Sequence, residues 1–311
     1  MINLSSKKIK ELYNQSNEFI NKRKFEEALA TINRLLEIDP KHAKGLAKLG
    51  YVHYRLGFKY ISREEVLKLN KKALGLNDQS SITWNCLGIA YSNAELYNEA
   101  LECFETSLAI NPKFSKALTS MGTVFFKMGK YKKAIKYFQD SLEVDPKNVD
   151  AIHNIAITYL RLLKFKKVIH YAREALNIDQ EYPDVWDTMG TAYFLLNNYK
   201  KAISCYQTVL ELDPHYLGAW YNLADVFIKQ KRYDSAINYY KKALELADKL
   251  NIEHKSSEYI KILCDLGEAY WRKKDINKAI ECCREALEID RKNYYAKSFL
   301  EKLHFRGIPF V

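Results

Sequence analysis

Residues 84–112 read WNCLGIAYSNAELYNEALECFETSLAINP, and this stretch decides the fold. Trp84, Gly88 and Tyr91 are spaced four and three positions apart. This spacing puts a large, a small and an aromatic side chain on one face of a helix. The pattern breaks near Tyr97 and then resumes with helical spacing. The stretch therefore predicts two antiparallel helices.

The same unit recurs along the chain. Its small residue returns with gaps of 38, 34, 34, 34, 34 and 43 residues, at Gly50, Gly88, Gly122, Ala156, Gly190, Ala224 and Gly267. Four units end in Asp-Pro or Asn-Pro, which stops a helix because proline disfavours the helical conformation of the residue before it. A helix of about 13 residues is not stable alone in water, so each unit must stack on its neighbours. The small residue lets two helices cross closely, and large aromatic residues fill the gap to the next pair.

The pattern Trp/Leu-x2-Leu-Gly-x2-Tyr, followed by Ala-x3-Phe and by Pro at a 34-residue period, resembles the tetratricopeptide repeat (TPR). The resemblance implies an all-α fold, an α-α superhelix (right-handed solenoid) of about eight helix-turn-helix repeats plus a C-terminal capping helix. One continuous domain over residues 1–311 is expected. The expected repeats are about 9–42, 43–80, 81–114, 115–148, 149–182, 183–216, 217–259 and 260–293, with the capping helix over 294–304.

Two insertions interrupt the period. Four extra residues fall around 57–66, in the turn of repeat 2, and nine fall around 247–259, between repeats 7 and 8. Helical periodicity continues over 240–250, so we expect a longer second helix there and an exposed loop at Glu253–Ser257. Such an insertion is either a tolerated surface loop or an edge specific to a partner.

Composition excludes several classes of protein. The chain has 311 residues, of which 48% are hydrophobic, and this is enough for a packed core. The net charge of +11 is spread evenly, with no basic arm typical of a nucleic-acid binder. The six cysteines show no C-x-x-C spacing, and neither a signal peptide nor a membrane-length apolar run is evident. A cytoplasmic protein is expected.

The sequence offers no catalytic chemistry. It lacks the metalloprotease H-E-x-x-H, the P-loop, the dinucleotide-binding G-x-G-x-x-G and the hydrolase G-x-S-x-G motifs. Its seven histidines are not spaced as metal ligands. Cys103, Cys205 and Cys282 share one slot of the second helix, where packing is the expected role. We therefore expect no enzyme activity, no cofactor and no metal.

The resemblance implies instead a scaffold for protein-protein interaction. In TPR proteins the first helices of successive repeats line a concave groove that holds an extended peptide or a partner helix. The candidate groove residues of repeats 1–4 are Lys10, Asn14, Asn17, Lys44, Lys48, Tyr51, Arg55, Asn85, Lys116 and Lys127. Those of repeats 5–8 are Asn154, Asp184, Asp187, Asn222, Asp225, Asp265 and Glu268.

The candidate groove changes in charge along the chain. Basic and asparagine residues dominate repeats 1–4 and are expected to hold a peptide backbone and carboxylates. Acidic residues gather in repeats 6–8 and are expected to meet basic side chains. A groove graded in sign would orient a ligand and speed its association; alternatively, these are simply solvated positions. The carboxylate clamp of chaperone-binding TPR domains is absent, since Tyr13 stands where its lysine belongs and Lys48 where its asparagine belongs.

Two other binding modes stay open. Lysines such as Lys130, Lys132 and Lys133 gather at the turns between paired helices, where they suit the helix dipole or would dock RNA or another anionic partner. The apolar tail Phe305–Val311 either packs on the last helix or enters a neighbouring copy and makes a homo-oligomer. The protein or peptide ligand itself is not identified by these residues.

Overall fold

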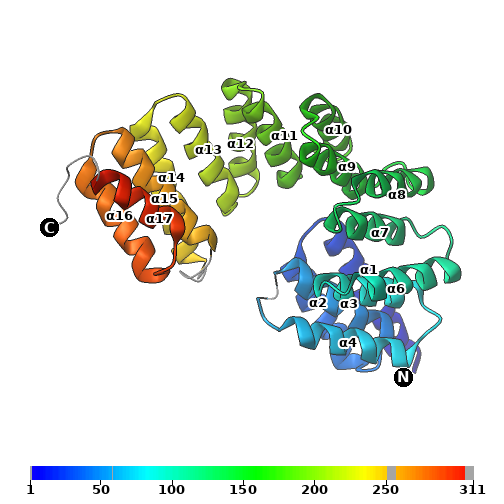
Figure 1. The fold of residues 1–311 in the computed structure, drawn as a ribbon. Helices are drawn as coiled ribbons and strands as arrows, with labels where there is room; N and C mark the ends of the chain where they lie inside the picture. The colour runs from blue at the N-terminus through cyan, green and yellow to red at the C-terminus, as the bar shows by residue number, and fades with distance from the viewer. Residues whose placement is uncertain (1, 58, 251–256, 305–311) are drawn as a thin grey trace. The chain divides into compact units, whose positions relative to one another are not determined.

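The computed structural model describes residues 2–57, 59–250 and 257–304, and these residues form helices and no β-strand (Figure 1). By compactness the chain divides into Met1–Thr158, here unit 1, and Tyr159–Val311, here unit 2. The prediction of one continuous domain over 1–311 stays a prediction.

Odd-numbered helices are the first helices of the repeats, and even-numbered helices are the second. The first helices are α1 (Ile2–Asn21), α3 (Ala43–Arg55), α5 (Ser81–Asn93), α7 (Ser115–Lys127), α9 (Val149–Arg161), α11 (Pro183–Leu195), α13 (Leu217–Lys229) and α15 (Ser257–Arg272). The second helices are α2 (Phe25–Ile38), α4 (Arg63–Leu76), α6 (Tyr97–Ile110), α8 (Tyr131–Val144), α10 (Phe165–Ile178), α12 (Tyr199–Leu212), α14 (Tyr233–Lys249) and α16 (Ile276–Ile289). The last helix is α17 (Tyr294–His304).

The helices pack as consecutive pairs within each unit. In unit 1, α1 packs on α2, α3 on α4, α5 on α6 and α7 on α8, and in unit 2 α11 packs on α12, α13 on α14 and α15 on α16. Second helices such as α2 and α14 also contact the first helix of the following repeat, and α17 packs on α16. The all-α fold of stacked helix pairs with a final capping helix is confirmed.

The small slot of the repeat admits an aromatic ring. Gly88 lies where α5 crosses α6, and a Cβ atom there would stand 2.5 Å from Phe104 Cε1. Gly122 meets Phe138 at the same distance. Phe104 is fully buried and shares a core cluster with Met121 of the next repeat. The aromatic ring therefore fills the space between one helix pair and the next, as predicted.

The turns between paired helices use left-handed backbone conformations that the sequence does not signal. Glu95 has φ of 62° and Gly129 has φ of 72°. With Glu95 in this conformation, the Leu96 amide reaches back to the Tyr91 carbonyl at 3.0 Å, which closes the end of α5 in a Schellman motif. Most of the described turns place a residue other than glycine at this position, so no glycine marks them.

The insertion in repeat 2 folds back onto repeat 1. It lengthens the connection between α3 and α4, and its Tyr60 hydroxyl donates to Glu26 Oε1 at 2.9 Å. The Lys59 ammonium lies 3.2 Å from the same oxygen. Glu26 thus holds the inserted loop against α2.

The end of α14 and the starts of α15 and α1 can be compared with the helix bounds predicted from the sequence. Helix α14 continues to Lys249, which confirms the longer second helix. Ser257 was expected in a loop, but this is wrong: it begins α15, because the buried Tyr259 and Ile260 continue the helical face into the insertion. Residues 253–256 of that loop and the tail 305–311 lie outside the described residues. Helix α1 begins at Ile2, earlier than the predicted start of repeat 1 near residue 9.

Candidate functional site

The predicted groove residues all lie on first helices, at different depths. In unit 1, Lys10, Asn14, Lys44, Lys116 and Lys127 are exposed, Asn17, Lys48, Tyr51, Arg55 and Asn154 are half-buried, and Asn85 is buried. In unit 2, Asp184, Asp187, Asn222, Asp225, Asp265 and Glu268 are all half-buried.

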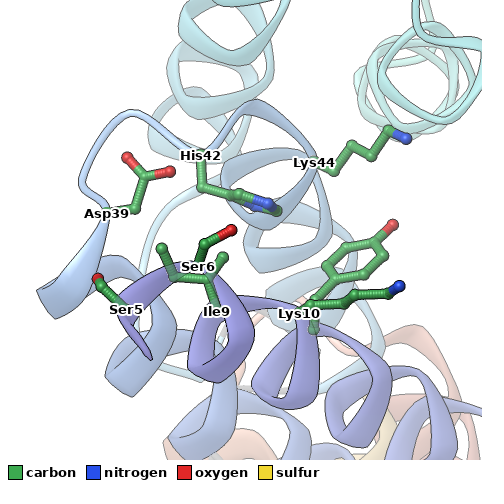
Figure 2. Close-up of a pocket in the computed structure, with 8 residues that line it drawn as sticks. Ser5, Ser6, Ile9, Lys10, Asp39, His42 and Lys44 are labelled. Atoms are coloured by element: carbon green, nitrogen blue, oxygen red, sulfur yellow. The ribbon is translucent and has the colours of Figure 1, made fainter. Parts of the chain in front are cut away.

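A surface pocket of about 790 Å³ opens in unit 1 beside the start of α1 (Figure 2). Its lining residues are Ser5, Ser6, Ile9, Lys10, Tyr13, Asp39, His42 and Lys44. His42 caps α3, since its Nδ1 accepts a hydrogen bond from the Gly45 amide at 3.0 Å. Burial lowers the pKa of His42, which favours the neutral imidazole that this bond requires. The pocket joins two predicted lysines to His42, a residue that no motif singled out.

Tyr13 lies between the pocket and the half-buried Lys48. Its ring is 5.5 Å from the His42 ring, and the Lys48 ammonium lies 4.4 Å from its centroid. Burial raises the pKa of Tyr13 to about 12. Burial also lowers the pKa of Lys48 to about 8, and the charges of Lys116 and Lys44 act in the same direction. No described carboxylate pairs with Lys48.

Other predicted residues of unit 1 bond to one another. The Lys127 ammonium donates to the Ser92 carbonyl oxygen at 3.2 Å and to Asn93 Oδ1 at 3.3 Å. The Lys116 ammonium lies 3.5 Å from Asn21 Oδ1, so α7 approaches the end of α1. These lysines of the first-helix face are partly satisfied within the unit, unlike Lys48.

In unit 2 the acidic residues accept hydrogen bonds from neutral donors. The bonds run from Tyr216 to Asp184 Oδ1 at 2.9 Å, from Asn222 to Asp187 Oδ1 at 2.8 Å, from Tyr221 to Asp265 Oδ2 at 2.7 Å, and from Tyr240 to Asp225 Oδ1. The donors Tyr221 and Asn222 both belong to α13, so this helix links the carboxylates of α11 and α15. We call Asp184, Asp187, Asp225, Asp265 and Glu268 the acidic face of unit 2.

Burial shapes the protonation of this face. It raises the pKa of Asp187 to about 6, although the hydrogen bond from Asn222 opposes the shift. It likewise raises the pKa of Asp265 to about 6, against the hydrogen bond from Tyr221 and with the like charge of Asp225. The pKa of Asp225 is also raised by burial. None of these carboxylates forms a described ion pair, and the nearby lysines Lys261 and Lys229 do not offset burial at Asp225 and Asp265.

Glu268 behaves differently because it has a cation. Burial would raise its pKa, but hydrogen bonds from Tyr295 and Arg272 outweigh burial and lower it. Arg272 Nη2 lies 2.6 Å from Glu268 Oε1, and the Tyr295 hydroxyl donates to Oε2 at 2.6 Å. Glu268 therefore has a phenol donor and a guanidinium donor, and the two together keep its pKa below the ordinary value.

Tyr216 and Tyr240 are the tyrosine donors that sequence reasoning missed. Tyr240 was expected only to pack, because it shares its slot with Phe104 and Phe138. A signal was present: the slot carries tyrosine in repeats 6 and 7, where acidic residues gather on the first helices, and phenylalanine in repeats 3 and 4. A buried hydroxyl needs a hydrogen-bond partner, and an aspartate of the first helix supplies it for Tyr240.

The basic residues at the turns have a packing role. In several repeats a lysine near the start of the second helix lies over an aromatic ring of the first helix. The distances from ammonium to ring centroid are 5.6 Å for Lys133 and Phe125, 4.8 Å for Lys167 and Tyr159, 5.3 Å for Lys201 and Tyr193, and 5.5 Å for Lys278 and Tyr270. These contacts favour a structural interpretation of the basic edge over docking of an anionic partner.

The sequence matches models of the tetratricopeptide repeat over residues 12–42, 81–114, 115–148 and 216–292, and a TPR repeat model over 190–231. An N-terminal acetyltransferase A complex subunit-like protein from Schizosaccharomyces pombe is 30% identical over 94 residues, which are 30% of this chain and 13% of that protein.

Solved structures share the fold. A chain of the APC/C hetero-tetramer Cut9-Hcn1 is similar with a TM-score of 0.74 and 19% identity, covering 94% of this chain and 55% of that chain. The C-terminal part of a TPR repeat-containing protein from Cytophaga hutchinsonii gives a TM-score of 0.52 and 21% identity, covering 81% and 98%. This chain thus spans about half of the Cut9-Hcn1 chain and a small part of the Schizosaccharomyces pombe relative.

Within the described residues, no helix combines the length and the apolar character needed to cross a membrane. The helix pairs, the glycine-aromatic crossings and the family matches, which together cover more than half of the sequence, agree with one another. The chain belongs to the tetratricopeptide repeat family.

Proposed function

We propose that the protein is a non-catalytic, cytoplasmic scaffold that binds an extended segment of a partner protein on the faces formed by its first helices. One observation carries this proposal: Lys48 in unit 1 and Asp187 in unit 2 are half-buried charges with no ion-pair partner among the described residues. A charge taken out of water without a counter-charge is unfavourable. A ligand that supplies the opposite charge would therefore bind with a gain in free energy.

In unit 1 the ligand groups are carboxylates and peptide backbone. Lys10, Lys44, Lys48 and Lys116 would meet carboxylates, while the asparagines would bond to the backbone. The buried oxygens Asn17 Oδ1 and Asn85 Oδ1 have no hydrogen-bond partner in the described structure. An unsatisfied buried polar atom costs about 1–3 kcal/mol, so a peptide backbone that reached these side chains would relieve that cost.

In unit 2 the ligand groups are basic side chains, which would meet Asp184, Asp187, Asp225 and Asp265. The relatives give general support for an interaction role, because their descriptions name a hetero-tetramer and a complex subunit. They identify no partner for this chain. We expect micromolar affinity, about −8 kcal/mol, for a segment bound along either face.

A random dodecapeptide library displayed on phage and selected on the full chain tests the proposal. We expect enrichment of charged peptides, and those with acidic residues should lose binding to the Lys44→Glu/Lys48→Glu/Lys116→Glu variant while its helicity stays unchanged. The control variant carries the same charge change on second helices, as Lys72→Glu/Lys132→Glu/Lys136→Glu, and should bind like the unmodified chain.

Two results oppose the proposal. If no peptide is enriched over an unrelated helical protein, the first-helix faces do not bind extended segments. If acidic peptides bind the first-helix variant and the control variant equally well, the basic residues of unit 1 are not the site.

A further inference from the structure

The acidic face of unit 2 presents carboxylates on three consecutive first helices. Asp187 lies on α11, Asp225 on α13 and Asp265 on α15. All three residues are half-buried, so each is partly desolvated and keeps part of its surface exposed to solvent. Each accepts its observed hydrogen bond from a neutral amide or phenol donor.

Lys261 and Lys229 lie near enough to lower the pKa of Asp225, and Lys261 that of Asp265, but neither lysine forms a described ion pair with them. No described ion pair includes Asp187, Asp225 or Asp265. The Lys261 ammonium lies instead over the Tyr221 ring, 4.6 Å from its centroid, and influences Asp225 and Asp265 from there. Lys261 is therefore a neighbour of the carboxylates and not an ion-pair partner.

Tyr221 is shared between two carboxylates. Its hydroxyl donates to Asp265 Oδ2 at 2.7 Å and also interacts with Asp225. A phenol carries a single hydrogen to donate, so it cannot satisfy both acceptors at once. A guanidinium group carries five N–H donors in a planar fork and pairs with carboxylates through two parallel bonds. Arg272 pairs with Glu268 on the same face, where its Nε and Nη2 atoms both donate to Oε1.

We infer that the acidic face of unit 2 binds an arginine-rich segment of a partner protein, with guanidinium groups paired to Asp187 of α11, Asp225 of α13 and Asp265 of α15. This inference rests on the proposed function and names the ligand class for one unit. The chain as a whole carries a net charge of +11, so long-range electrostatics repels such a segment. Binding must then come from the local carboxylates.

Protons compete with the arginine groups for these sites. The groups that act on the three carboxylates are Asp184, Asn222, Cys205, Tyr206 and Tyr216 around Asp187, and Tyr221, Lys229, Tyr240, Lys261, Cys264, Glu268 and Tyr295 around Asp225 and Asp265. Burial raises the pKa values of Asp187 and Asp265 to about 6, so both carboxyl groups take up protons as the pH falls below 6. Guanidinium binding requires the ionised form. Binding should therefore weaken on acidification and should release protons near pH 6.

The test uses the full chain and a fluorescein-labelled, acetylated peptide amide of four Arg-Gly-Ser repeats. The comparison peptide has citrulline in place of arginine, which keeps the shape and removes the charge. We expect saturable binding of the arginine peptide only, about tenfold weaker at pH 5 than at pH 7.5 for each carboxylate that must ionise. Calorimetry at pH 6 in buffers of different ionisation enthalpy should show proton release.

A pair of variants locates the site. Asp187→Asn/Asp225→Asn/Asp265→Asn keeps the hydrogen-bond acceptors and should abolish both binding and its pH dependence. Glu174→Gln/Glu211→Gln/Glu245→Gln removes the same charge from exposed positions of second helices and should bind like the unmodified chain. Circular dichroism of both variants establishes that the helices are intact.

Each result decides one question. Equal binding of the citrulline peptide, equal binding by the two variants, or binding without proton release in the unmodified chain overturns the inference. If the arginine peptide fails to bind while the phage library still yields specific ligands, the scaffold function stands and the arginine class is wrong. If neither binds, the proposed function itself is wrong.

Discussion

The Tyr240 hydroxyl donates a hydrogen bond to Oδ1 of Asp225, which joins the second helix of repeat 7 to the acidic face of its first helix. Tyr240 is 1% exposed and occupies the slot that Phe104 and Phe138 fill in repeats 3 and 4. In those repeats the slot only packs. In repeat 7 it also donates to the half-buried carboxylate of Asp225, so one slot connects the core to the candidate site.

Removing this hydroxyl should destabilise unit 2. Tyr240→Phe keeps the ring but takes a donor from a buried carboxylate, at an expected cost of about 1–3 kcal/mol at pH 7.5. Tyr239→Phe is the matched control, because the Tyr239 ring stacks on Phe227 while its hydroxyl has no acceptor among the described residues. That change should stay within about 0.5 kcal/mol. Urea midpoints followed by circular dichroism compare the two, and equal shifts would mean that the Asp225 bond contributes nothing.

The repeat made most of the fold predictable. Periodic small and aromatic residues predicted the helix pairs, because such residues are required wherever two helices cross, as at Gly88 and Phe104. The left-handed turns were not predictable, because Glu95 and residues like it carry no glycine signal. The start of α15 was misplaced for a related reason, since Ser257 follows an insertion that has no counterpart in other repeats.

The sequence predicted which helices carry the residues of the candidate site, but it did not predict their hydrogen-bond partners. Counting from the small residue placed Lys48 and Asp187 on first helices, where the structure has them. Counting within a repeat gives no hydrogen-bond partners from other repeats, so the bond from Asn222 to Asp187 was not foreseen. His42 was missed because it precedes α3 and enters the pocket as a helix cap.

A methyl group at the helix crossing should destabilise unit 1. Gly88→Ala would place Cβ 2.5 Å from the fully buried Phe104 ring, and overpacking of this kind costs about 1–3 kcal/mol. Gly75→Ala is the control, because Gly75 is an exposed residue of α4 and nothing lies within 4 Å of its Cβ position. It should stabilise by about 0.5–1 kcal/mol. Thermal melts should show a lower melting temperature for Gly88→Ala and a higher one for Gly75→Ala. Adding Phe104→Leu to Gly88→Ala should restore part of the lost stability.

Asp187→Asn should raise the thermal stability of the protein at neutral pH. The pKa of Asp187 is raised by burial to about 6. The protonated carboxyl group therefore contributes favourably to the stability of the folded state below pH 4, and this contribution is lost as the pH rises through 6. Above that pH the ionised carboxylate disfavours the folded state, by about 3 kcal/mol at most. Asparagine still accepts the hydrogen bond from Asn222. The melting temperature of the variant should exceed that of the unmodified chain at pH 7.5 by more than it does at pH 4.5, whereas Glu211→Gln should give no pH-dependent difference. A variant less stable at pH 7.5 would show that the carboxylate is satisfied within the protein.

Lys48→Met should stabilise unit 1 at neutral pH and weaken its binding of acidic peptides. Burial lowers the pKa of Lys48 to about 8. The neutral amine therefore contributes favourably to the stability of the folded state above pH 10, and this contribution is lost as the pH falls through 8. At pH 7 the charged ammonium is therefore held at a cost, which methionine removes while keeping contact with the Tyr13 ring. The gain in melting temperature should shrink between pH 7 and pH 9.5, and exposed Lys44→Met should show no such trend. If Lys48→Met melts lower at pH 7, the contact of its ammonium with Tyr13 outweighs desolvation, and Lys48 belongs to the packing of the unit and not to a ligand site.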